Sequence, residues 1–193
     1  GVSPERILLL TFTNKAAKEM MSRVTDLIGH DLRELWGGTF HSIGHRVLRR
    51  HAESINFRQG FTIQDREDAK GLINACIAEA GIDVKATRFP KPDVLTDIFS
   101  LAVNMQVEVT EVLEERYSWF DHLREEIGDI GRRYTARKQS NGMMDFDDLL
   151  VLWLKLMRGQ DDLRELYQRR FQFVLVDEYQ DTNRLQADLI DLL

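Results

Sequence analysis

The feature that most constrains this chain lies at residues 173–183. A short apolar run, 173–176, ends in two adjacent carboxylates, Asp177 and Glu178, and a polar stretch then opens a helix. A buried parallel strand delivers acidic groups in this way to the carboxyl edge of a sheet, where α/β folds bind nucleotides. One carboxylate there can hold Mg²⁺ on a phosphate chain, while its neighbour orients or deprotonates a water. The segment therefore predicts an α/β fold with a metal-dependent nucleotide site.

Two earlier segments repeat this passage from strand to helix. Residues 6–12 predict a buried parallel strand, and residues 13–24 predict the helix that follows it. Residues 36–40 form a second apolar stretch, interrupted by two glycines, which leads into a helix over 42–53. Each passage is half of a βαβ unit, which agrees with a parallel sheet.

The middle of the chain, residues 62–142, has a helical pattern instead. Asp65 predicts the N-cap of a helix that ends near residue 81, Pro92 the start of another helix, and Thr110 the cap of a third. Asp145 then caps an apolar helix over 146–157. We therefore expect a helical insertion within an α/β scaffold, which resumes with helices at 162–169 and 184–193 around the strand at 173–176.

The composition predicts a folded chain of one or two domains. The 193 residues are 43% hydrophobic and 30% charged. They contain no apolar run of roughly 18 residues and no signal-peptide pattern, so we expect a cytoplasmic protein with no membrane partner. The single cysteine, Cys76, lies in an apolar helical stretch and is interpreted as a buried thiol. The net charge of -6 is uneven, because residues 1–60 carry nine Lys and Arg against six Asp and Glu; a basic patch there could bind phosphates.

Four segments carry a resemblance to a known family. Residues 177–183 resemble motif II, the Walker B motif, of UvrD/Rep/PcrA-type superfamily 1 DNA helicases. Residues 11–20 look like motif Ia, residues 38–42 look like motif Ib, and residues 144–149 resemble the stretch where the helical subdomain of that family returns to its ATPase core. The resemblance implies a partial RecA-like, P-loop NTPase core with an inserted all-helical subdomain. We place the core at 1–61 and 143–193 and the insertion at 62–142.

The resemblance also implies the roles of the acidic segment. Asp177 would ligate the Mg²⁺ of Mg-ATP, and Glu178 would activate the attacking water as the catalytic residue. We assign Gln180 to the nucleotide site as well. ATP and Mg²⁺ are thus the expected cofactors of a helicase in DNA repair or replication that moves on single-stranded DNA, with a 3′ to 5′ direction implied by the family.

Motifs Ia and Ib supply the expected DNA-binding residues. An aromatic ring can stack on an unpaired base, and a helix start with a lysine can bind a phosphate. On the residues alone Phe12 is more often core and a lone histidine such as His41 is more often structural. The resemblance favours a DNA role for both. The DNA-binding residues expected at single strands and at junctions with duplex are Phe12, Asn14, Lys15, Thr39, His41 and Phe146. The three aspartates around Phe146 are interpreted as helix capping and not as a metal cluster.

One expected motif is absent from the sequence. A P-loop needs a glycine-rich loop with a lysine that holds the phosphates, and the chain contains no Gly-Lys dipeptide. We therefore expect an interior fragment of a larger nucleoid-associated helicase. The Walker A segment would precede Gly1, and the second RecA-like domain would follow Leu193. Residues 1–193 alone should show no measurable ATP hydrolysis, and a missing central strand should separate the strands and leave an apolar sheet edge uncovered.

Two alternatives stay open at this point. The chain could belong to the helicase subunit of a RecB/AddA-like helicase-nuclease, which shares these motifs. It could also be a non-catalytic DNA-binding module that lacks a P-loop.

Overall fold

The computed structural model describes residues 2–28 and 34–193, which form two compact units. One unit comprises Gly1–Asn56 and Leu149–Leu193, and the other comprises Phe57–Asp148. The sequence placed these divisions a few residues away, at 61/62 and 142/143. The second division has a physical cause: strand β4 (Met143–Met144) pairs in parallel with β3 (Thr62–Ile63), so residues 143–144 belong to the helical unit.

The first unit is built on a parallel sheet of β1 (Ile7–Thr11), β2 (Trp36–Thr39) and β5 (Phe173–Val176). The strand order is β2-β1-β5, with Thr11 opposite Thr39 and Leu10 opposite Val176. This confirms the predicted α/β core with a parallel sheet. Because all three strands run in the same direction, their carboxyl ends meet at one edge of the sheet.

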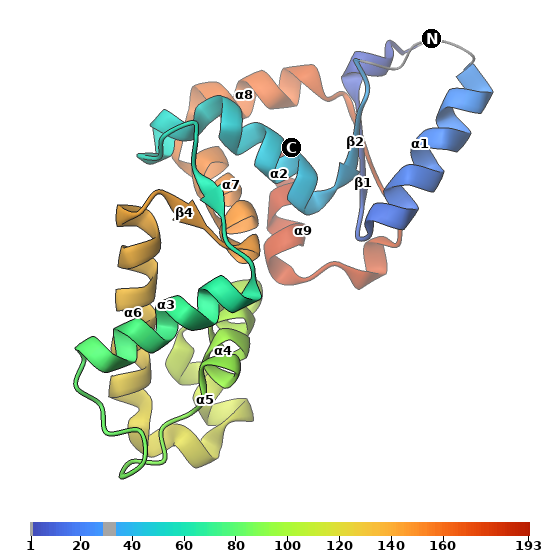
Figure 1. The fold of residues 1–193 in the computed structure, drawn as a ribbon. Coiled ribbons are helices and arrows are strands. Elements are labelled where there is room, and N and C mark those ends of the chain that lie inside the picture. Colours follow the sequence, from blue (N-terminus) through green and yellow to red (C-terminus); the bar gives the residue numbers. More distant parts are fainter. Residues whose placement is uncertain (1, 29–33) are drawn as a thin grey trace. The chain divides into compact units, whose positions relative to one another are not determined.

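Helices cover the two faces of this sheet unequally. On one face, α1 (Asn14–Ile28) packs Met20, Met21 and Val24 against Ile7 and Leu9 of β1. Helices also lie on the other side of the sheet (Figure 1). They are α2 (Phe40–His51), α7 (Phe146–Gly159), α8 (Asp161–Arg170) and α9 (Arg184–Asp191).

Strand β5 is the least covered part of the sheet. Its Phe173 and Leu175 lie opposite Ile7 and Leu9 in the register and are 49% and 54% exposed. We expected an absent strand between the strand pair, and this was wrong, because β1 and β5 pair directly. The uncovered apolar surface therefore belongs to β5 itself and not to a gap within the described sheet.

A close approach fixes how α2 packs on α7. A Cβ added at Gly44 would lie 2.9 Å from the carbonyl oxygen of Leu149 and 3.3 Å from the ring of Trp153. Real Cβ atoms essentially never come that close to backbone, so α2 reaches α7 only because this residue has no side chain.

The helical unit contains α3 (Arg66–Glu79), α4 (Pro92–Met105), α5 (Val109–Arg116) and α6 (Arg124–Ser140). Its core consists of apolar side chains from these four helices and their connections: Ala69, Ile73, Cys76, Ile77, Phe89, Leu95, Ile98, Ala102, Val112, Leu113, Leu123, Ile127, Ile130 and Tyr134. The predicted cap at Asp65 is confirmed, with Asp68 completing a capping box, and Pro92 opens α4 as expected. The predicted cap at Thr110 was wrong. Glu108 is the N-cap of α5: its backbone N–H donates to the Glu111 carboxylate at 3.2 Å, and the Glu111 N–H donates to the Glu108 backbone carbonyl at 3.1 Å.

Cys76 is buried in that core, as the sequence predicts. In the described part of the chain, no helix is both long enough and apolar enough to span a membrane.

Candidate nucleotide and DNA site

The carboxyl edge of the sheet gathers most of the predicted site residues. Thr11 and Thr39 are register partners, so the residues that follow β1 and β2 begin at the same level. The backbone N–H of Asp177 donates to the carbonyl of Leu10 at 2.9 Å, which continues the ladder one residue beyond β5. The ends of three adjacent strands thus bring Phe12, the start of α2 and Asp177 to one edge.

Asp177 is an open carboxylate at this edge. Its side chain is exposed and has no hydrogen bond or ion pair with any described residue. Magnesium usually keeps several waters and takes only one or two protein carboxylates beside the phosphates of its ligand. A single open aspartate at the end of a strand fits that requirement. Within the described residues, no group of three or more His, Cys, Asp or Glu is arranged to hold a metal ion.

Glu178 occupies a backbone conformation that side chains rarely adopt. Its φ is 52° and its ψ is 47°, in the left-handed region. Such a conformation costs a non-glycine residue about 1–2 kcal/mol, and residues of this kind cluster at functional sites. The left-handed residue turns the chain from β5 into the short helix η4 (Tyr179–Asp181), whose Asp181 N–H donates to the Glu178 carbonyl at 2.9 Å. The Glu178 carboxylate accepts a hydrogen bond from the side-chain amide of Gln180. Gln180 therefore contacts the Glu178 carboxylate directly.

Phe12 lies at the junction of β1 and α1, as predicted. Its ring is half-buried and packs against Phe40, with the two ring centroids 5.5 Å apart and the planes tilted by 42°. Asn14 and Lys15 are exposed in the first turn of α1. The turn itself is held by Thr13, whose hydroxyl accepts from the Ala16 N–H at 3.1 Å. The arrangement leaves an aromatic edge beside an exposed helix start and a lysine.

The structure gives Thr39 a local structural role. Thr39 is buried and is the N-cap of α2, where its hydroxyl accepts from the Ser42 N–H at 3.1 Å. Ser42 donates in return to the Thr39 carbonyl at 2.8 Å. His41 is half-buried in the first turn of the same helix. Sequence reasoning did not see this cap, although a threonine directly before an apolar-periodic helical segment is a signal for one.

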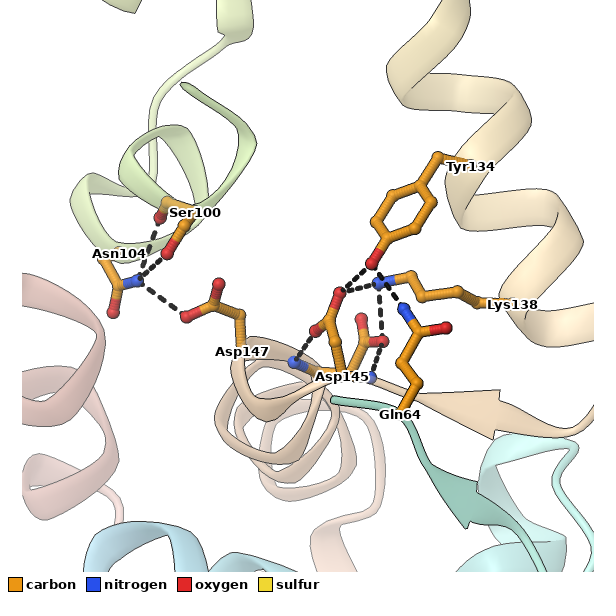
Figure 2. Close-up of polar contacts among 8 residues, drawn as sticks. Gln64, Ser100, Asn104, Tyr134, Lys138, Asp145 and Asp147 are labelled. Carbon is orange, nitrogen blue, oxygen red and sulfur yellow. Dashed lines mark hydrogen bonds and ion pairs between the residues drawn. The ribbon is translucent and has the colours of Figure 1, made fainter. Parts of the chain in front are cut away.

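Phe146 belongs to the helical unit, where it is the first residue of α7 and is 58% exposed. The aspartates around it are all engaged (Figure 2). Asp145 accepts from the Asp148 N–H and Asp148 from the Asp145 N–H, both at 2.9 Å, which confirms helix capping. Asp147 accepts from the side-chain amide of Asn104 on α4 at 2.8 Å.

Lys138 is a buried partner of this turn that the sequence interpretation missed. Its ammonium lies 2.6 Å from a carboxylate oxygen of Asp145 and 2.6 Å from one of Asp148. The hydroxyl of Tyr134 donates to Asp145 at 2.9 Å and accepts from the Gln64 amide at 2.5 Å (Figure 2). A signal was present in the sequence: along α6, Ile127, Ile130, Tyr134 and Lys138 recur at helical spacing, so the lysine occupies an apolar-face position. A lysine at such a position requires an acidic partner.

The two carboxylates that share Lys138 differ in their proton affinity. Burial and the neighbouring charge of Asp145 raise the pKa of Asp148 to about 6, although Lys138 opposes this. Burial also acts to raise the pKa of Asp145, but the charge and hydrogen bond of Lys138 outweigh it, and the net result is a lowered pKa. Asp145 additionally accepts from Tyr134, so Asp148 is the carboxylate that takes up a proton first.

Comparison with known proteins gives this geometry a family. The family model described as the UvrD/REP helicase N-terminal domain matches residues 1–193. The chain is 38% identical over 192 residues to the ATP-dependent DNA helicase PcrA of Staphylococcus epidermidis, and 37% identical to that of Bacillus subtilis. The match covers 100% of this chain but 26% and 25% of those proteins, so the chain spans about a quarter of the length of the relatives. The chain belongs to the UvrD/REP helicase N-terminal domain family.

Proposed function

We propose that this chain is part of an ATP-dependent DNA helicase that couples hydrolysis of Mg-ATP to movement on single-stranded DNA. The observation that carries the proposal is the single sheet edge where Asp177, Glu178 and Phe12 follow the ends of adjacent parallel strands. Because the carboxylates and the aromatic ring lie at one edge, a bound nucleotide and a bound DNA strand would both contact the short loops that follow these strands. The similarity to proteins named ATP-dependent DNA helicase PcrA supports this assignment.

In this proposal each carboxylate has one task. Asp177 would hold Mg²⁺ through its open carboxylate, and the ion when bound would supply positive charge to the phosphate chain. Glu178 accepts the proton of the attacking water at its carboxylate. Gln180, which donates to Glu178, keeps that carboxylate turned toward the site. The strained backbone of Glu178 agrees with a residue placed for chemistry at a cost in stability.

The phosphate cradle and an arginine that stabilises the transition state are proposed to come from segments outside these 193 residues. The greater length of the relatives leaves room for both. Because positioning and charge supply nearly all the catalysis in phosphoryl transfer, residues 1–193 by themselves should not hydrolyse ATP measurably.

The chemical step is tested by Glu178→Gln in the full-length protein. The variant should bind Mg-ATP as well as the wild type does and should lose DNA-stimulated hydrolysis by a factor of at least about 100, which is the low end for removing a general base. Glu165→Gln is a matched control, because Glu165 lies on α8 and pairs with Arg169 on the surface. Hydrolysis by Glu178→Gln at the wild-type rate would overturn the proposed role.

DNA binding is tested at Phe12. Because Phe12 packs on Phe40, Phe12→Leu is preferred to alanine, since it keeps most of the apolar contact and removes the ring face. The affinity for single-stranded oligonucleotide should fall by about 1–3 kcal/mol if a base stacks there. Phe173→Leu, an exposed aromatic on β5, is the control. An unchanged affinity for Phe12→Leu would return Phe12 to a purely structural role.

The direction of movement is proposed to be 3′ to 5′, on the family resemblance. Strand displacement from duplexes with a 3′ or a 5′ single-stranded tail measures it directly. Faster displacement from the 5′-tailed duplex would contradict the proposal.

A further inference from the structure

Three arginines gather on one buried indole, away from the site described above. The guanidinium carbons of Arg46, Arg50 and Arg170 lie 3.8, 4.8 and 5.1 Å from the ring centroid of Trp36. Arg46 and Arg50 lie one turn apart on α2, and Arg170 ends α8. Trp36 opens β2 and is fully buried, so the cluster lies at the amino end of that strand, opposite the edge that carries Asp177.

These arginines form no ion pair with a carboxylate of the described residues, although the charge of Glu34 acts on Arg46. Across residues 2–28 and 34–193, no carboxylate comes within ion-pair distance of any of the three. Most other described arginines do have such partners: Arg66, Arg124, Arg132, Arg133, Arg137, Arg158, Arg164 and Arg169. The Nε of Arg170 is moreover buried without a hydrogen-bond partner. The cluster therefore concentrates positive charge in a chain whose net charge is -6.

The surroundings of the cluster show that its field is positive. Burial and then the charges of Arg50 and Arg170 lower the pKa of Arg46, while Tyr167 and Glu34 act in the opposite direction. Burial and the charge of Arg50 also lower the pKa of His51, whose ring is 3.0 Å from the Tyr167 hydroxyl. The neighbouring histidine is thus kept neutral near pH 7.

Like charges held together without counterions cost free energy, which a bound anion would recover. A guanidinium presents a planar fork of donors that matches the oxygens of a phosphate. Trp36 holds the three guanidiniums in place by contact with its ring, so less side-chain freedom is lost on binding. Arg50 is exposed and can reach a ligand. Arg46 and Arg170 are half-buried and contribute positive charge to the site.

We propose that Arg46, Arg50 and Arg170 form a binding site for a backbone phosphate of nucleic acid. The choice of nucleic acid over an acidic protein segment rests on the proposed function, which places this chain on DNA. Because the proposed ligand is a backbone phosphate, the contact carries no information about base sequence. It adds to DNA affinity at the edge of the sheet opposite Phe12.

The test is the salt dependence of DNA binding in the full-length protein. For a backbone contact, the logarithm of the association constant falls with the logarithm of the salt concentration by about 0.9 per phosphate on duplex and about 0.7 on a single strand. Arg50→Gln should make this slope shallower by about one such increment on at least one of the two DNA forms, and it should weaken binding several-fold at low salt. Arg50→Lys keeps a positive charge and should retain most of the slope.

The matched control is Arg169→Gln, which removes one positive charge from the same helix as Arg170. Arg169 is 81% exposed and already pairs with Glu165. The salt dependence of DNA binding by Arg169→Gln should therefore equal that of the wild type. Arg50→Ala is the second variant. Because Arg50 also contacts the Trp36 ring and Tyr167, thermal unfolding of both Arg50 variants is measured, and DNA binding is compared at temperatures where both are folded. A wild-type slope in Arg50→Gln and Arg50→Ala on both DNA forms overturns the phosphate site and leaves an acidic protein segment as the ligand to examine.

Failure of this site and failure of the proposed function give different results. If the wild type binds DNA and Phe12→Leu weakens it, while the Arg50 variants behave like the wild type, only the phosphate site is wrong. If the wild type does not bind DNA at all, the proposed function fails and the site fails with it.

Discussion

Replacing Asp148 by asparagine should remove a pH dependence from the stability of this protein. Asp148 is 20% exposed, and it shares the Lys138 ammonium with Asp145, at 2.6 Å from each carboxylate. One positive charge cannot neutralise two buried carboxylates. Burial and the charge of Asp145 therefore raise the pKa of Asp148 to about 6 in the folded protein.

The sign and size of the effect follow from that pKa. A free aspartate has a pKa of about 3.9, so folding raises the value by about two pH units, which corresponds to about 3 kcal/mol. For a carboxyl group with a raised pKa, the folded state is favoured while the group is protonated, and this contribution is lost as the pH rises through about 6. Between pH 5 and pH 7 the free energy of unfolding should fall by about 1 kcal/mol from this group alone.

Urea denaturation of the wild type and Asp148→Asn at pH 5, 6 and 7 measures the effect. Other groups titrate in this range, and His45 and His51, whose pKa values are lowered mainly by burial, destabilise the fold as the pH falls. The informative quantity is therefore the difference between the two proteins, in which those groups cancel. Asparagine can keep the hydrogen bond from the Asp145 N–H and stays neutral. The free energy of unfolding of the variant, relative to that of the wild type, should therefore rise by about 1 kcal/mol from pH 5 to pH 7. A difference that does not change with pH would refute the reasoning.

Three further changes test the packing and capping described above. Lys138→Met should destabilise the protein by about 3–5 kcal/mol at pH 7, because it leaves two buried carboxylates unpaired, and the loss in urea denaturation should shrink at pH 5 as a carboxylate takes up a proton. Gly44→Ala should cost about 1–3 kcal/mol by the same assay, since its Cβ would meet the Leu149 carbonyl at 2.9 Å, whereas Gly71→Ala, with open space around it, should not. Asn183→Ala should lower thermal stability by about 1 kcal/mol, because Asn183 caps α9 at the Gln186 N–H at 2.8 Å.

The elements that could be predicted from the sequence are those whose signals are local. An apolar run followed by polar residues gave β1 and β5 within a residue or two, and Asp65, Pro92 and Asp145 marked helix starts through chemistry that acts over three or four residues. Where two polar residues compete for a cap, the pattern is ambiguous. The pattern predicted Thr110 as the cap of this helix, whereas Glu108 caps α5. A glutamate is a weaker cap signal because it depends on a partner such as Glu111.

What the sequence could not supply are the contacts between distant segments. The two-residue strand β4 exists only because it pairs with β3, some 80 residues earlier in the chain. Lys138 is buried because α6 places it against the first turn of α7, and the arginine cluster forms because α8 delivers Arg170 to a tryptophan at the start of β2. In each case the residues carry an ordinary polar or short apolar pattern, and tertiary structure alone gives them their role.

The distribution of charge on the sheet leads to a last prediction about DNA. At the carboxyl edge the exposed carboxylates of Asp177, Glu178 and Asp181 would repel phosphates, so under the proposed function a DNA strand there would be held mainly by stacking on Phe12, with Lys15 as a basic contribution. At the amino end of β2 the proposed phosphate site would attract phosphates, and the Trp36 ring is buried and offers no face for stacking. Phe12→Leu should therefore lower affinity by a similar factor at all salt concentrations, whereas the loss in Arg50→Gln should diminish as salt rises. If both variants lose affinity with the same salt dependence, the two edges do not divide the binding in this way.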